Sequence, residues 1–184
     1  MNAIDFLMNS MRTMRTTGAI ARSSKYLSRE MLKSIQFNHA RVIVEMGAGD
    51  GVFTYSILEK MRKDAILLCF EINPEFHRIL QGINDPRFIL INDSAEHLKK
   101  YLVQYHHKEV DYIISGIPFV ALPAELSDRI IRVSRDALRK NGLFIQFHYT
   151  TLISRMYKRI FWNLHIRFVP LNFPPAFVMV CKKL

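Results

Sequence analysis

The segment Glu45-Met46-Gly47-Ala48-Gly49-Asp50-Gly51 decides the fold class of this chain. It closes a β-rich run at residues 42–45 and precedes a segment with helical periodicity. Glycines there let the backbone turn sharply and approach a ligand, and the free N–H groups of the following helix face the same space. The dinucleotide fingerprint G-x-G-x-x-G would need a third glycine where Val52 stands. The segment therefore predicts a nucleotide-binding turn of a different type.

From residue 41 onward, short β-rich runs alternate with longer helical segments. This alternation is typical of a parallel sheet with helices on both faces. The connection between the last two β-runs is too short for a parallel crossover, so we expect that pair to be antiparallel. The predicted strands are 42–45, 66–70, 88–91, 112–114, 143–147, 166–169 and 177–181. The predicted helices are 53–62, 74–83, 95–105 and 125–140, the last of them ending at Asn141-Gly142.

Composition indicates one globular domain without a metal site. The chain has 184 residues, of which 49% are hydrophobic. Its two cysteines, Cys69 and Cys181, lie far apart in apolar runs, and its seven histidines are scattered, so we expect neither a disulfide framework nor a metal centre. No apolar run reaches the roughly 20 residues that a membrane-spanning helix needs. These features fit a reducing, cytoplasmic setting.

The charge balance predicts an anionic partner. Lys and Arg number 26 and Asp and Glu 16, for a net charge of +10, which favours nucleic acid or an acidic membrane surface. Residues 1–36 stand outside the alternation and form a separate N-terminal segment before a domain at 37–184. On a helical wheel its apolar residues fall within about 120°, as in an amphipathic helix for a membrane surface or for the protein's own domain. These residues are Ile4, Leu7, Met8, Met11 and Met14.

Three carboxylates at successive strand ends strengthen the nucleotide interpretation. Glu45 and G-x-G-x-G together resemble motif I of class I S-adenosylmethionine-dependent methyltransferases. Glu71 stands where such enzymes bind the ribose hydroxyls, and Asp93 where they face the adenine amino group. The resemblance implies a seven-stranded doubly wound α/β sheet of order 3-2-1-4-5-7-6 with one strand reversed. It also implies S-adenosylmethionine as cofactor, S-adenosylhomocysteine as product, and a binding site made of Ser24, Glu45, Gly47, Ala48, Gly49, Gly51, Glu71, Ile72, Asp93, Ser94, Ala95 and Ser115.

The segment after the fourth strand, residues 115–123, indicates the methyl acceptor. Enzymes that methylate nucleobase amines usually carry an Asn- or Asp-led tetrapeptide ending in Pro-Tyr or Pro-Phe. Here Ile117-Pro118-Phe119 is present, but Ser115-Gly116 replaces the Asn, and a hydroxyl does not reproduce the geometry of an amide. The same segment resembles bacterial phospholipid N-methyltransferases, whose loop reads Ser-small-Leu/Ile-Pro and returns to Leu-Pro.

Three further segments carry this resemblance, at residues 18–27, 144–149 and 172–176, with Arg22 and His148 as departures from the usual Pro and Thr. It implies N-methylation of phosphatidylethanolamine towards phosphatidylcholine. It implies catalytic roles for Tyr26, Ser115 and Tyr149, and substrate contacts from Gly116, Ile117, Pro118, Phe119, His148 and Tyr149. Whether any of these side chains acts as a general base stays open.

The resemblance also implies where the protein works. We expect a monomer bound peripherally to the inner face of the membrane, with the N-terminal helix on anionic phospholipid. Residues 155–162 are either a second membrane contact or a helix with core aromatics and a basic face. The alternatives are an N-methyltransferase of another amine-bearing lipid such as ornithine lipid, an RNA adenine N6-methyltransferase, and a cofactor-binding protein without activity. RNA enzymes generally append a helical domain, which is not seen here, so we expect no nucleic-acid partner.

Overall fold

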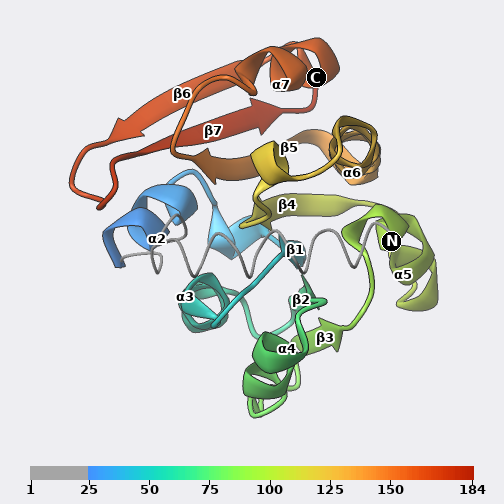
Figure 1. Ribbon diagram of the computed structural model, residues 1–184. Coiled ribbons are helices and arrows are strands. Elements are labelled where there is room, and N and C mark those ends of the chain that lie inside the picture. Colours follow the sequence, from blue (N-terminus) through green and yellow to red (C-terminus); the bar gives the residue numbers. More distant parts are fainter. Residues whose placement is uncertain (1–24) are drawn as a thin grey trace.

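A seven-stranded sheet with the order β3-β2-β1-β4-β5-β7-β6 forms the centre of the protein, as seen in a computed structural model that describes residues 25–184 (Figure 1). β1 to β5 are parallel, and β7 runs antiparallel to both β5 and β6. The predicted strand order and the reversed strand are confirmed. The strands are β1 (Val42–Met46), β2 (Ile66–Phe70), β3 (Phe88–Ile91), β4 (Val110–Ser115), β5 (Leu138–His148), β6 (Leu164–Val169) and β7 (Ala176–Lys182).

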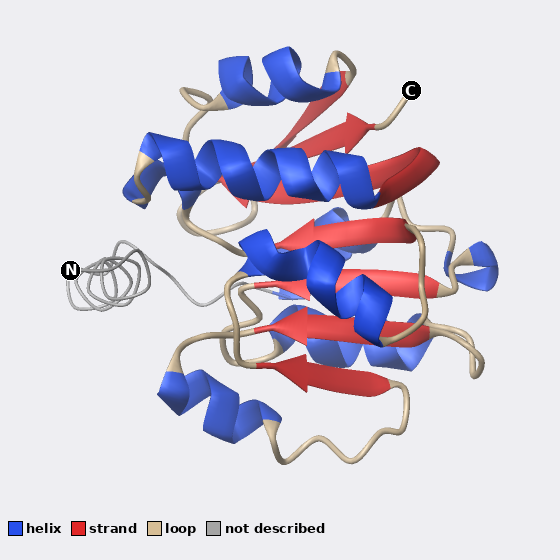
Figure 2. Cartoon of the chain, turned by 90° about the vertical axis from the view of Figure 1, so that its right-hand side faces the viewer, coloured by secondary structure: helices blue, strands red, loops and turns tan. Residues whose placement is uncertain are grey.

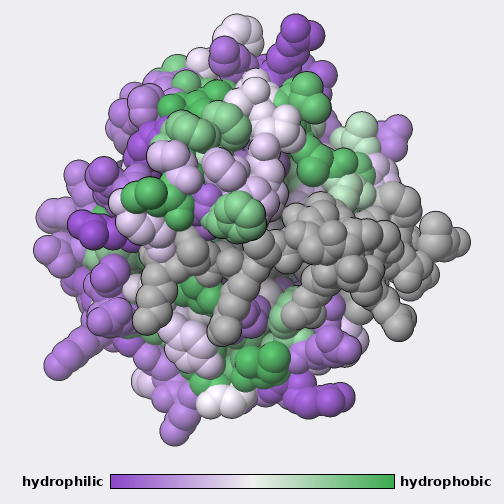
Figure 3. Space-filling view, turned by 60° about the vertical axis from the view of Figure 1, so that its left-hand side comes forward, coloured by the Kyte–Doolittle hydropathy of each residue, from purple (hydrophilic) through white to green (hydrophobic). Residues whose placement is uncertain are grey.

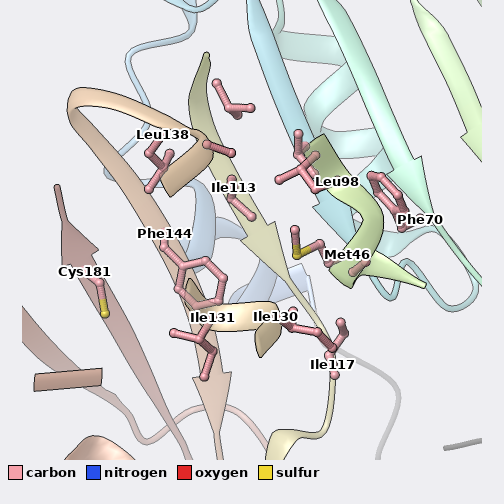
Figure 4. Packing of buried hydrophobic residues seen from close by; sticks show 14 of the residues in the cluster. Met46, Phe70, Leu98, Ile113, Ile117, Ile130, Ile131, Leu138, Phe144 and Cys181 are labelled. Atoms are coloured by element: carbon pink, nitrogen blue, oxygen red, sulfur yellow. The ribbon is translucent and has the colours of Figure 1, made fainter. Parts of the chain in front are cut away.

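Helices cover both faces of the sheet (Figure 2). They are α2 (Lys25–Leu32), α3 (Val52–Lys60), α4 (Pro74–Leu80), α5 (Leu98–Gln104), α6 (Ala124–Ala137) and α7 (Ser154–Phe161), with short 3₁₀ turns η1 (Phe37–His39), η2 (Ala95–His97) and η3 (Phe119–Ala121). One core cluster joins α5, α6 and α7 to the sheet, and the other joins α2 and α3. In the first cluster, Met46, Ile113 and Phe144 from three neighbouring strands lie near Ile130 and Ile131 of α6 (Figure 4).

The end of α6 differs from the prediction. The helix stops at Ala137, and Leu138 begins β5 by pairing with Val110, with a register shift in β4 between Val110 and Tyr112. Asn141 does adopt the left-handed conformation, with φ of 63°, but inside the strand rather than at a helix end. Leu138 is fully buried, so its burial in the sheet outweighs one more turn of helix.

The described part of the N-terminal segment is packed into the core. Leu27 and Met31 of α2 are fully buried in the second cluster. Arg167 of β6 donates to Ser34 Oγ at 2.7 Å and to the Glu30 carbonyl at 2.6 Å, which ties α2 to the far edge of the sheet. The amphipathic helix predicted before residue 15 lies outside the described residues. Within residues 25–184, no helix has the length and apolar character to cross a membrane.

Candidate active site

The glycine loop between β1 and α3 leaves room for a ligand above its backbone. Gly49 has a φ of +61°, a conformation that residues with a side chain rarely adopt, and a Cβ built there would meet no atom within 4 Å. The Gly49 N–H is held by Glu71 Oε2 at 2.8 Å. The loop is therefore fixed in a shape that exposes backbone to a bound molecule.

Glu71, which follows β2, clamps the loop from one side. The residue is 1% exposed, and its Oε1 accepts a hydrogen bond from the Asn73 N–H at 2.8 Å while Oε2 binds Gly49. Burial raises the pKa of this carboxyl, and the backbone N–H donors oppose that rise. Two carboxylate oxygens offer about four acceptor positions, so this side chain retains capacity for ribose hydroxyls.

Glu45 lies in β1 beneath the loop with one oxygen unsatisfied. Thr54 of α3 donates to Glu45 Oε2 at 2.7 Å, whereas Oε1 is buried and forms no hydrogen bond of ordinary geometry with a described residue. Burial, reinforced by the neighbouring charge of Glu71, raises the pKa of Glu45 to about 8. A cation beside Oε1 would reverse this shift, because an opposite charge favours the ionised carboxyl. The sequence analysis did not identify Thr54 as a partner of the site.

Asp93, after β3, is already engaged by its own chain. Its Oδ1 accepts from the Ser94 N–H at 2.7 Å and contacts His97 Nδ1 at 2.8 Å, and its Oδ2 accepts from Tyr101 at 2.8 Å. Burial opposes ionisation, but the hydrogen bonds from His97 and Tyr101 dominate and lower the pKa of Asp93 to about 2. The carboxylate thus stays charged. If it binds the adenine amino group as predicted, it does so while still accepting hydrogen bonds from these donors.

The loop after β4 packs directly against the glycine loop. The Gly116 N–H donates to the Met46 carbonyl at 2.8 Å, and a Cβ at Gly116 would lie 2.6 Å from the Gly47 carbonyl oxygen. Ser115 is fully buried, and its Oγ accepts from the Ile117 N–H at 3.3 Å. Position 116, where the sequence departs from the nucleobase motif, is therefore occupied by glycine because the two loops touch there.

Two of the predicted substrate contacts in this loop, Ile117 and Phe119, are packed in the core. Phe119 is 2% exposed, and its ring meets those of Tyr157 and Phe144 at centroid distances of 6.4 Å. Ile117 is also buried in the first core cluster, whereas Pro118 is half-buried. An aromatic ring enclosed in this way has no face left for stacking on a base.

The end of β5 contributes Gln146, which the sequence analysis omitted from the site, and His148, which it predicted to contact substrate. Gln146 is 1% exposed and donates to the Ile117 carbonyl at 3.1 Å, so it joins β5 to the β4 loop. The sequence feature that could have identified Gln146 is a single amide side chain within an apolar strand. His148 was predicted to contact substrate, but it is buried, and its Nε2 lies 2.9 Å from the Tyr157 hydroxyl. Burial lowers the pKa of His148 to about 4, so the ring is neutral at pH 7.

Tyr149 follows β5 and carries a buried hydroxyl that forms no hydrogen bond of ordinary geometry with a described residue. Burial raises its pKa, and the nearby Asn172 side chain partly offsets that effect. Tyr26 lies on α2 and is largely exposed, and Ser24 falls outside the described residues. The remaining predicted cofactor contacts follow the strand ends: Ala48 and Gly51 in the glycine loop, Ile72 after β2, and Ser94 and Ala95 after β3.

These groups fit S-adenosylmethionine. The open backbone at Gly49 suits a bulky nucleoside, Glu71 retains acceptors for hydroxyls, and the unsatisfied oxygen of Glu45 suits an ammonium group. Among residues 25–184, no three His, Cys, Asp or Glu side chains gather as metal ligands.

Comparison with known proteins identifies the family. The chain is 32% identical over 167 residues to the ornithine lipid N-methyltransferase of Singulisphaera acidiphila, covering 89% of this chain and 87% of that protein. No protein-family model matches the chain.

Solved structures confirm the fold. A Burkholderia thailandensis 1,6-didemethyltoxoflavin N1-methyltransferase with bound S-adenosylhomocysteine superposes with a TM-score of 0.72 at 12% identity, covering 97% of this chain and 88% of the other. Aeropyrum pernix fibrillarin with bound S-adenosylmethionine gives 0.57 at 20% identity, covering 78% and 66%. The protein is an S-adenosylmethionine-dependent methyltransferase, and the chain belongs to the lipid N-methyltransferase family of the class I fold.

Proposed function

We propose that the protein transfers methyl groups to the headgroup amine of a membrane lipid at the membrane surface. The observation that carries the proposal is the similarity, over most of both chains, to a protein named for ornithine lipid methylation. The buried Phe119 supports it, because that ring would have to be free in a nucleobase enzyme. The RNA alternative thus has no aromatic stacking group at this loop.

Two headgroups are candidates, phosphatidylethanolamine and ornithine lipid. A phosphate is usually bound by Arg or Lys. Within the described chain, the site segments 47–51, 71–73, 93–95, 115–119 and 146–149 contain neither residue. An ornithine headgroup presents an amine and a carboxylate in place of the phosphate, and a carboxylate is likewise usually bound by Arg or Lys. The lack of basic residues therefore does not separate the two headgroups, and the name of the relative is what favours ornithine lipid over phosphatidylethanolamine.

The chemistry requires a neutral amine held in line with the methyl group. S-adenosylmethionine supplies an electrophilic sulfonium methyl, whose C–S bond breaks as the amine nitrogen forms the new C–N bond. His148 does not serve as the base, because its ring is enclosed and its pKa is depressed. Tyr149, whose pKa is raised, keeps its proton and orients the amine, and the amine loses its proton to water.

The test is methyl transfer from labelled cofactor to purified lipids in detergent micelles. Separate reactions would contain ornithine lipid, phosphatidylethanolamine, its monomethyl and dimethyl forms, or ribosomal RNA. We expect label in ornithine lipid, with phosphatidylethanolamine as the second substrate. Labelled RNA together with unlabelled lipids would contradict the proposal.

A further inference from the structure

We infer that the turn between β6 and β7, residues 170–175, inserts its apolar side chains into a lipid bilayer and holds the active-site edge against the membrane. The inference deepens the proposed function, on which it rests for the identity of the surface. The turn lies within the described residues and is distinct from the N-terminal segment.

The strand register places this turn beside the site. His148, at the carboxyl end of β5, pairs with Phe177 at the start of β7, and Val169, at the end of β6, pairs with Ala176. The turn therefore projects from the same edge at which the parallel strands β1, β4 and β5 end. Asn172 of the turn lies near the Tyr149 hydroxyl, so the turn reaches the site.

In this turn the polar side chain is buried and the large apolar side chains are exposed, the reverse of the usual arrangement. Asn172 is 3% exposed, and its Nδ2 donates to the Pro174 carbonyl at 2.7 Å, so the polar side chain braces the turn from within. Its neighbours point outward, with Leu171 67% and Phe173 90% exposed. Exposure of such large apolar groups to water is unfavourable, whereas their burial in a membrane interface is favourable.

More exposed apolar side chains lie at the same edge. Leu152, in the connection from β5 to α7, is 83% exposed, and Phe168 near the end of β6 is also exposed. Figure 3 shows hydrophobic side chains gathered on the upper half of the face towards which the hairpin turns, with a hydrophilic flank beside them. Several apolar groups at one edge suit a planar surface better than a single binding pocket.

The charge distribution selects an anionic bilayer as the occupant. Residues 137–184 contain eight Lys and Arg and no Asp or Glu, whereas residues 1–136 contain 18 basic and 16 acidic residues. Arg139, Lys140, Lys182 and Lys183 lie at the opposite edge, where β5 begins and β7 ends. Arg159 and Arg167 pair with Asp128 and Glu30, so the basic groups available to a membrane at the site edge are those of α7. Arg155 and Lys158 of α7 are exposed. Apolar insertion combined with basic residues is how peripheral proteins bind anionic lipid.

The test uses the full chain and vesicles of phosphatidylglycerol and phosphatidylcholine, which lack any amine substrate. The variant L171S/F173S changes only exposed side chains, and I79S/V103S is its matched control. Ile79 and Val103 are also exposed, but they lie near the ends of α4 and α5 that lead back towards the opposite edge. We expect vesicle binding to weaken about tenfold or more in L171S/F173S and to stay at the wild-type level in I79S/V103S.

A fluorescence measurement locates the inserted group. The chain has one tryptophan, Trp162, which is 80% exposed where α7 ends at the opposite edge, so the wild-type protein serves as the control. In W162F/F173W, we expect emission to shift to shorter wavelengths on vesicles and to be quenched by brominated acyl chains. Emission from Trp162 in the wild-type protein should stay unchanged.

Three results would overturn the inference. The first is equal vesicle binding by L171S/F173S and wild type. The second is a tryptophan in W162F/F173W that stays accessible to aqueous quenchers when the protein is on vesicles. The third is self-association of the wild-type protein that L171S/F173S abolishes while vesicle binding persists, which would assign the turn to a second copy. The proposed function is judged separately by methyl transfer to detergent-dispersed lipid, where L171S/F173S should match wild type.

Discussion

The cofactor half of the site, built on β1 to β3, and the acceptor half, built on β4 and β5, use their polar residues differently. In the cofactor half, Glu45 and Glu71 keep acceptor capacity that the protein does not fill. In the acceptor half, His148 contacts Tyr157 of α7 and the Gln146 amide nitrogen donates to the β4 loop, whereas Gln146 Oε1 forms no hydrogen bond with a described residue. The contrast teaches that unfilled hydrogen-bonding capacity distinguishes a ligand contact from a structural one. In the acceptor half it leaves the Tyr149 hydroxyl and Gln146 Oε1 as candidates.

Replacing Glu71 should produce the largest loss of cofactor affinity, because this side chain holds the glycine loop. For Glu71→Gln, we expect S-adenosylhomocysteine to bind about 100-fold more weakly, since hydrogen bonds to a charged group contribute about 1.5–3 kcal/mol. Isothermal titration calorimetry would measure the affinity. Glu59→Gln, on the exposed side of α3, is the matched control and should bind normally. Similar affinities for the two variants would remove Glu71 from the cofactor half.

Gly116→Ala should show that the two halves are in contact. The added Cβ would meet the Gly47 carbonyl oxygen at 2.6 Å, so one loop must shift. We expect a loss of about 1–3 kcal/mol in the free energy of unfolding, measured in urea, because overpacking typically costs that much. Gly82→Ala is the control, since its Cβ would meet only the Ile79 carbonyl at 3.4 Å. Equal stability in both variants would contradict the close packing.

The pH dependence of stability tests whether the buried Glu45 carboxyl, with its unsatisfied oxygen, has a raised pKa in the folded protein. Burial raises its pKa from 4.5 to about 8 in the folded protein, so the folded state binds a proton that the unfolded state releases. This contribution is complete below pH 4.5 and is lost as the pH rises through about 8. Without cofactor, wild type should lose stability relative to Glu45→Gln across that window, by at most about 1.4 kcal/mol per pH unit. A constant difference between the two would show that Glu45 is ordinarily ionised.

The smallest effect comes from removing single hydroxyls in the acceptor half. Tyr149→Phe should lower kcat/KM for lipid about tenfold with little change in stability, because its hydroxyl orients the amine. Tyr157→Phe removes the partner of His148 and should cost about 1 kcal/mol of stability while leaving KM unchanged. Urea unfolding and steady-state kinetics on both variants separate the two roles. The reverse pattern would exchange their assignments.

Strand ends, glycines and carboxylates are local signals, so the sequence predicted which groups the structure brings together in the cofactor half, such as Gly49 and Glu71. It predicted the strand order through the resemblance and the short β6–β7 connection. It could not predict the burial of Phe119 and His148, since a resemblance places residues along the chain without showing which way the side chains point. The end of α6 was misplaced because Asn141-Gly142 favours the left-handed conformation in a helix end and in an irregular strand alike.

The most direct test of the central claim is mass spectrometry of lipids from a bacterial host that makes phosphatidylethanolamine and ornithine lipid but methylates neither. Expression of the wild-type chain should produce amine lipids heavier by one, two or three CH2 groups, with the added mass on the headgroup. The Glu71→Gln variant, expressed at the same level, should produce far less of these species. An unchanged lipid profile with wild-type protein that binds S-adenosylhomocysteine would contradict the account.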